Sequence, residues 1–194
     1  MKTLLVSILL LSTTSLFAQI DARLMHQPDV SESHIVFSYA NNLWLVPKEG
    51  GQALQLTTAD GEEYHPKFSP DGSHIAFSGN YQGNYDVYKM SIQGALPQRL
   101  TYHGYSDRVL GWHPNGEQVL FASSRKSGKM RWRQFYLSNE EGLPTKLPIE
   151  HGEYGSLSED GKTIAFTDKS RVSRNWKRYR GGTAPDIWVM NLED

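Results

Sequence analysis

Cysteine is absent from all 194 residues of the sequence. A disulfide framework, a thiolate metal site and a lipid-modified cysteine behind a leader segment are therefore excluded together. A domain of ~150 residues still removes roughly two thirds of its unfolded surface from water. We therefore expect a hydrophobic core that needs no covalent links.

Familiar catalytic and cofactor motifs are missing as well. The sequence has no H-E-x-x-H pair, phosphate loop, dinucleotide fingerprint or calcium loop. The nearest approach to a nucleophile elbow is Gly104-Tyr105-Ser106-Asp107-Arg108, which lacks the second glycine. We therefore expect no catalytic residue, no cofactor and no bound metal in this chain.

Charge of either sign is not in excess, because the formal net charge is −1. A near-neutral total gives no general attraction to nucleic acid or to anionic lipid. Nucleic acid is therefore not an expected partner.

The first residues have the features of an export signal. Lys2 is followed by an apolar stretch from Leu4 to Leu11, and Ala18-Gln19 offers a small-residue cleavage point. The stretch is shorter than the ~20 residues that span a bilayer. We expect 1–18 to be a signal peptide, with no membrane span after its cleavage, and 19–194 to be periplasmic or secreted.

A segment of about twelve residues recurs along the chain. Its turn glycines, Gly72, Gly116 and Gly161, are 44 and 45 residues apart. A degenerate copy at 31–38 lacks the turn glycine but keeps the strand sequence His-Ile-Val-Phe-Ser. A fixed period in the mid-forties is typical of repeat architectures, in which each repeat is one supersecondary unit. The three clear copies are 67–78, 111–122 and 156–167.

Each copy carries a Pro-Asp-Gly-like turn between two short apolar strands. Proline presets φ, Asp or Asn bonds locally, and glycine takes the positive φ that closes the turn. Repeated acids can also be ligands, but Asn115 stands where the other copies have Asp71 and Asp160. An amide would weaken a metal site and suit a turn, so we interpret all three as turn residues.

Each repeat predicts four short strands in a sheet that is covered on both faces. Nearly continuous apolar runs such as Ile75-Ala76-Phe77 indicate this burial. The sequence therefore predicts an all-β protein, a β-propeller of four-stranded antiparallel blades. A β-sandwich is the alternative, but it would lack the long period. The blades are expected at about 22–58, 62–102, 106–149 and 152–194.

The fourth repeat lacks its last strand, so we expect an incomplete ring of about three and three-quarter blades. Its third strand, Asp186 to Met190, would then lie at an open edge. The two end faces of the stack would carry exposed apolar side chains, among them Phe37, Ile164 and Trp188.

More than half of the 20 lysines and arginines lie in two loops, each between the second and third strands of a blade. Such loops emerge on one rim, and arginine binds carboxylates through two parallel hydrogen bonds. A peptide-binding or partner-binding rim is one hypothesis, and a solvated rim or a contact with another domain is the other. The candidate residues are Arg125, Lys126, Arg131, Arg133, Arg174, Lys177, Arg178 and Arg180.

Two motifs resemble known families. The pattern from Phe68 to Phe77 resembles the blades of TolB-type propellers, which specifies a fold and no function. The segment from Asn175 to Trp188 is similar to the fourth blade of the N-terminal propeller of tricorn-type proteases, and the preceding blades follow the same order. The similarity covers nearly all of 19–194.

The tricorn resemblance implies a scaffold and substrate-gating domain of a serine peptidase. The full-length protein would have a second propeller, a PDZ-like module and a catalytic core outside this chain, and could be homo-oligomeric. Expected partners are peptides or the C-terminal domains of the same protein. A TolB-like binding propeller without an enzyme and the propeller of a prolyl-oligopeptidase-type hydrolase are the alternatives.

Overall fold

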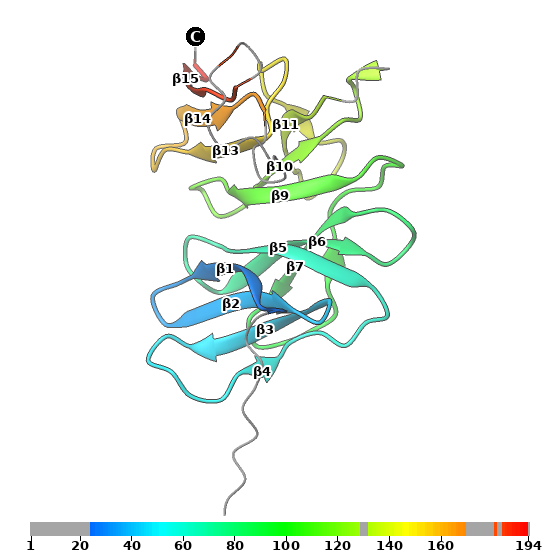
Figure 1. The fold of residues 1–194 in the computed structure, drawn as a ribbon, viewed down its shortest axis with the longest axis vertical. Coiled ribbons are helices and arrows are strands. Elements are labelled where there is room, and N and C mark those ends of the chain that lie inside the picture. The colour runs from blue at the N-terminus through cyan, green and yellow to red at the C-terminus, as the bar shows by residue number, and fades with distance from the viewer. Residues whose placement is uncertain (1–23, 129–131, 170–180, 182–183, 194) are drawn as a thin grey trace, which may run out of the picture.

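The computed structural model describes residues 24–128, 132–169, 181 and 184–193, and in this part of the chain every regular element is a β-strand (Figure 1). No helix within these ranges is long and apolar enough to cross a membrane. All strand pairs are antiparallel. The signal peptide expected at 1–18 lies outside the described residues.

Four sheets follow one another along the chain, and each is built from one copy of the repeat. The first two are four-stranded, with their strands in sequence order. The first sheet contains β1 (His26–Val30), β2 (His34–Tyr39), β3 (Asn42–Pro47) and β4 (Leu54–Gln55), and the second contains β5 (Glu62–Phe68), β6 (His74–Asn80), β7 (Asp86–Ser91) and β8 (Gln98–Arg99).

The third sheet repeats this plan, whereas the fourth has three strands among the described residues, with β15 at its edge. β15 begins one residue later than the sequence predicted. The third sheet contains β9 (Asp107–Trp112), β10 (Val119–Ser123), β11 (Gln134–Leu137) and β12 (Thr145–Lys146), and the fourth contains β13 (Tyr154–Leu157), β14 (Thr163–Thr167) and β15 (Ile187–Asn191).

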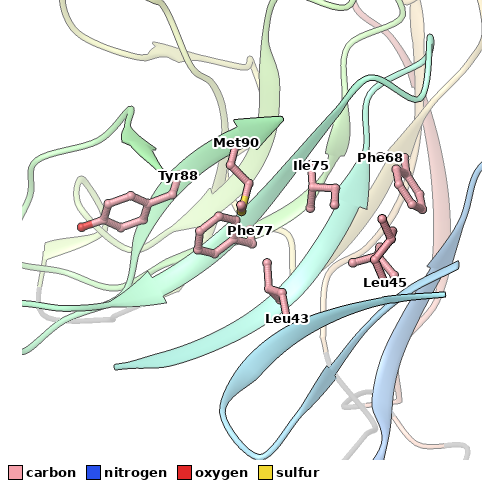
Figure 2. Packing of buried hydrophobic residues seen from close by; sticks show 8 residues of the cluster. Leu43, Leu45, Phe68, Ile75, Phe77, Tyr88 and Met90 are labelled. Atoms are coloured by element: carbon pink, nitrogen blue, oxygen red, sulfur yellow. The ribbon is translucent and has the colours of Figure 1, made fainter. Parts of the chain in front are cut away.

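Apolar side chains fill the space between neighbouring sheets. Figure 2 shows Leu43 and Leu45 of the first sheet against Ile75 and Phe77 of the second. A second cluster joins sheets two and three, and a third joins sheets three and four. β10 is buried along its whole length, as a strand covered on both faces should be. The predicted propeller architecture is confirmed, and the ring is not closed.

The end faces are less open than the sequence suggested. Phe37 is only 7% exposed and Ile164 is fully buried, so the expectation that both lie on open faces is wrong. Successive side chains of a strand point to opposite faces, and Ile164 belongs to the face that packs on the third sheet. Trp188 is 54% exposed, as expected.

The recurring turns have the geometry that their residues predicted. Gly72, Gly116 and Gly161 have φ values of 69°, 76° and 72°. Asp71 Oδ1 accepts a hydrogen bond from the amide of the residue two positions on, at 3.0 Å, and so does Oδ1 of Asn115 and of Asp160. These side chains stabilise hairpins, which confirms that they are turn residues.

Gly116 is the position at which the need for a positive φ can be tested alone. An added Cβ there would have no neighbour within 4 Å, so a substitution causes no steric clash. We expect Gly116→Ala to lower the free energy of unfolding by ~1–2 kcal/mol, the cost of a left-handed conformation for an L-residue. Gly111 also has open space around an added Cβ, but no positive φ, so Gly111→Ala is the matched control. Urea unfolding that affects both variants equally would contradict this account.

Candidate functional site

The first strands of the four sheets form the inner surface of the stack. β5 contacts β1 on one side and β9 on the other, and β9 contacts β13. Near the start of β5 and β9 lies a cavity of about 240 Å³, here called the inner-strand pocket. Its lining residues come from the second and third sheets: from β5, from β6 and from the residue before β7, and from the start of β9 and the loop that enters β11. They are Tyr64, His65, Ser78, Tyr85, Ser106, Asp107, Arg108 and Arg133.

A backbone irregularity shapes one wall of the pocket. The register of β5 against β6 shifts between Tyr64 and Lys67, and His65 within this bulge has φ 56°. β1 has a matching irregularity with Gln27 at φ 53°. The Gln27 side chain accepts a hydrogen bond from the His65 amide at 2.7 Å. A bulge redirects side chains, and this one brings His65 into the pocket wall.

Two guanidinium groups in the pocket share one carboxylate. Arg108 and Arg133 each donate to Oε2 of Glu153, both at 2.9 Å. Arg108 also donates to the Glu153 carbonyl, and its guanidinium carbon lies 4.3 Å from the centre of the Tyr154 ring. Because two positive groups face one negative group, this cluster has an excess positive charge. The Arg108 Nε is buried and has no hydrogen-bond partner among the described atoms.

His65 is held in its neutral form. Burial is the main cause that lowers the pKa of His65 to about 4, and the positive charges of Arg108, Lys67 and Arg133 lower it further. At neutral pH the imidazole therefore adds no charge to the pocket. Only the arginines give it the capacity to attract an anion.

Ser106, His65 and Asp107 line the same pocket, but they do not form a catalytic triad. Among the described atoms, the His65 ring bonds to the Gln27 amide at 3.5 Å, and Asp107 pairs with Arg125. A serine nucleophile needs a hydrogen-bonded base and an orienting acid. Nor do the described residues contain a group of three or more acidic and histidine side chains that could hold a metal.

Arg125, a predicted rim residue, points inward. Its side chain is 8% exposed and pairs with the buried carboxylate of Asp107. The guanidinium carbon lies 5.1 Å from the ring centre of Phe121 and 5.3 Å from that of Tyr136. An arginine that is buried between two rings and paired with an internal acid is a structural residue, which removes Arg125 from an open binding surface.

The other predicted rim residues have different positions. Lys126 is exposed, and Arg133 lies in the inner-strand pocket. Arg131, Arg174, Lys177, Arg178 and Arg180 lie outside the described residues.

Sequence reasoning missed Arg108 and Glu153. They are 45 residues apart, which is the interval of the repeat, so they occupy equivalent positions in neighbouring blades. Opposite charges at equivalent positions of adjacent repeats would have indicated a contact between the inner strands.

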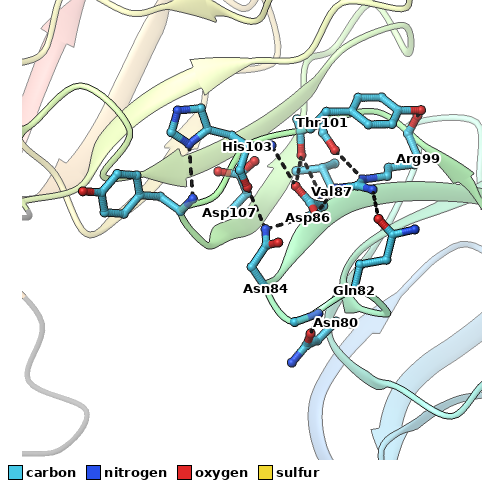
Figure 3. A network of polar contacts seen from close by, with 12 residues as sticks. Asn80, Gln82, Asn84, Asp86, Val87, Arg99, Thr101, His103 and Asp107 are labelled. Atoms are coloured by element: carbon cyan, nitrogen blue, oxygen red, sulfur yellow. Dashed lines mark hydrogen bonds and ion pairs between the residues drawn. The ribbon is translucent and has the colours of Figure 1, made fainter.

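A polar network supports the pocket from the junction of the second and third sheets (Figure 3). Asp86 is paired with Arg99 at 2.7 Å, and its Oδ2 also accepts a hydrogen bond from Asn84 at 3.1 Å. Burial raises the pKa of Asp86, and the charge of Arg99 opposes this effect. The amide of Asp107 donates to the Tyr85 carbonyl at 2.7 Å, which ties the start of β9 to the second sheet.

Comparisons of the sequence and of the structure with known proteins both find tricorn proteases. The family model of the tricorn protease N-terminal beta propeller domain matches residues 22–194. Tricorn protease homolog 1 of Streptomyces coelicolor is 28% identical over 162 residues, which cover 82% of this chain and 15% of that protein. This chain thus spans a small part of that relative's length.

Solved structures show the same fold. The crystal structure of the tricorn protease superimposes with a TM-score of 0.72 at 22% identity, over 86% of this chain and 17% of that one. TolB from Acinetobacter baumannii superimposes with a TM-score of 0.66 at 21% identity, over 87% of this chain and 41% of that one.

The depressed pKa of His65 predicts a pH dependence of stability. Between its folded pKa of about 4 and its unfolded value of 6.5, the unfolded chain binds the proton more strongly, so stability falls as the pH falls. When the pH is lowered from 6.5 to 5, we expect the titration of His65 alone to lower the free energy of unfolding by ~1.5 kcal/mol.

His65→Asn tests this dependence, because asparagine tolerates the positive φ at this position. Urea unfolding at both pH values should show a smaller loss for the variant than for the wild type. Equal losses would mean that His65 is not held neutral in the folded chain.

Proposed function

Because the chain belongs to the family of tricorn protease N-terminal β-propeller domains, we propose that it is a scaffold and substrate-gating module of a serine peptidase whose catalytic core lies outside this chain. The match over 22–194 supports this proposal, and it favours the tricorn interpretation over a TolB-like binding propeller without an enzyme.

We further propose export to the periplasm or the exterior, on the basis of the apolar segment after Lys2.

The pair of arginines that shares Glu153 is the observation on which the gating function rests. One guanidinium can be satisfied by Glu153, which leaves donor capacity for a second carboxylate. Arg133 is the accessible member, with 35% of its side chain exposed, whereas Arg108 is 13% exposed. An entering carboxylate would therefore bind Arg133 first, while Arg108 stays on Glu153.

The pocket suits the end of a peptide and little more. Its volume of about 240 Å³ lies below the ~300–1,000 Å³ of pockets that enclose drug-sized ligands. A C-terminal carboxylate or an acidic side chain fits this size, and both carry the charge that the arginines attract. The proposed gate therefore selects peptides by a negative group and holds them at the inner strands.

Paired peptides test this selection. A fluorescent peptide with a free C-terminal carboxylate should bind about tenfold more tightly than its C-terminal amide, because a hydrogen bond to a charged group contributes ~1.5–3 kcal/mol. Arg133→Gln should abolish the difference, whereas Lys146→Gln, which removes a charge from exposed β12, should preserve it. Equal binding of the acid and the amide by the wild type would refute the carboxylate site.

The expectation that this chain has no catalytic residue has its own test. The purified chain should not hydrolyse peptides or esters, because Ser106, His65 and Asp107 are not joined by hydrogen bonds in the described structure. Turnover that is abolished by Ser106→Ala would contradict this expectation.

A further inference from the structure

One position of the repeat carries a flat side chain in every sheet. It lies near the start of the first strand, opposite the residue that follows the phenylalanine of the second strand. Imidazole, phenol and guanidinium groups are all planar, and each can stack on an aromatic ring. The four residues, here called the planar row, are paired as His26↔Ser38, Tyr64↔Ser78, Arg108↔Ala122 and Tyr154↔Thr167.

Neighbouring members of the planar row are in contact at both of its ends. The ring centroids of His26 and Tyr64 lie 5.3 Å apart, and the guanidinium carbon of Arg108 lies 4.3 Å from the centre of the Tyr154 ring. Among the described residues, no such contact joins Tyr64 to Arg108, although their strands β5 and β9 are adjacent. Both side chains line the inner-strand pocket. The pocket therefore occupies the gap in the planar row.

The tyrosines of the pocket present ring surface to it rather than hydroxyl groups. Tyr64 donates its phenol hydrogen to Oδ1 of Asn41 at 3.2 Å, and Tyr85 donates to Glu62. Neither acceptor lines the pocket. The two rings have centroids 5.8 Å apart and are tilted by 43°. This wall therefore favours contact with an apolar, flat group over a hydrogen-bonding one.

A guanidinium group contributes a second wall of the gap. Arg108 is held by Glu153 and by the Tyr154 ring, and its side chain is only 13% exposed. A cation that is partly removed from water attracts an aromatic face more strongly than an exposed cation does. An aromatic group in the gap would thus contact tyrosine rings and a guanidinium, whereas an aliphatic group would gain only burial.

The remaining polar groups of the pocket add no competing charge. Asp107 is paired with Arg125, and His65 is neutral at neutral pH. Ser78 Oγ already accepts a hydrogen bond from a β9 amide at 2.9 Å. Arg133 thus remains the accessible charge, at the side of a gap whose other walls suit a ring.

We propose that the inner-strand pocket selects peptide substrates that end in phenylalanine or tyrosine. The aromatic ring of this last residue lies between Tyr64 and Arg108 and completes the planar row, and its carboxylate binds Arg133. The inference rests on the carboxylate site proposed above and specifies the side chain that this site prefers. A volume of about 240 Å³ limits the pocket to the last residue of the peptide.

Three labelled peptides that differ in their last residue test this selection on the wild-type chain. They are Gly-Gly-Gly-Phe, the same peptide with cyclohexylalanine, and Gly-Gly-Gly-Phe amide. Cyclohexylalanine keeps the apolar bulk of phenylalanine but has no π electrons. In an anisotropy titration the phenylalanine acid should bind about fivefold more tightly than the cyclohexylalanine acid, because ring and cation–π contacts add to burial.

Two variants of Tyr64 form a matched pair. Tyr64→Leu removes the ring and should abolish the preference for phenylalanine over cyclohexylalanine. Tyr64→Phe loses only the hydrogen bond to Asn41 and should keep the preference. Tyr102→Leu removes a 73% exposed tyrosine that does not line the pocket, so it should also keep the preference. Circular dichroism and urea unfolding establish that the variants fold, and the wild-type comparison is decisive without them.

Two results would overturn the aromatic preference and leave the carboxylate site in place. One is equal binding of the phenylalanine and cyclohexylalanine acids by a wild-type chain that still binds the acid more tightly than the amide. The other is a preference for phenylalanine that folded Tyr64→Leu retains, because the ring would then bind elsewhere. Equal binding of phenylalanine acid and amide would instead refute the carboxylate site, and this inference with it.

Discussion

Burial of each sheet against its neighbours is the constraint on which this structure depends. Three apolar clusters fill the three interfaces between the four sheets, and among the residues that the structure describes each cluster spans one interface. Interfaces of this kind make the stability of a repeat array approximately a sum of nearest-neighbour contributions. Within the described part of the chain, the second and third sheets are covered on both faces, whereas the fourth is covered on one face and exposes side chains such as Trp188 elsewhere.

The same stacking positions the candidate site. At each junction, a residue at or near the start of the incoming first strand donates its amide to the carbonyl of the residue just before the third strand of the preceding sheet. These bonds are Glu63 to Asn41 at 3.0 Å, Asp107 to Tyr85 at 2.7 Å and Gly152 to Arg133 at 2.8 Å. The last bond holds Arg133 beside Glu153. Only glycine fits at 152, because a Cβ would lie 2.3 Å from the Phe135 ring.

The architecture could be predicted from the sequence because its determinants are local and repeated. A turn such as Pro70-Asp71-Gly72 specifies its own hairpin, and the repeat interval specifies the stack. The site could not be predicted in the same way. Arg125 faces inward because its partner, Asp107, begins a different strand, and His65 enters the pocket through a bulge that no sequence pattern marked. Such contacts depend on register and on the packing of one sheet against the next.

Hydrogen exchange measured strand by strand on the monomeric chain tests the neighbour-burial account most directly. The account predicts that amides of β6 and β10, in the two sheets covered on both faces, exchange slowest, and that those of β14 exchange faster, although all three strands are paired on both sides within their sheets. Protection of β14 equal to that of β6 and β10 would contradict the account, because it would show that pairing within a sheet protects these strands without a second neighbouring sheet.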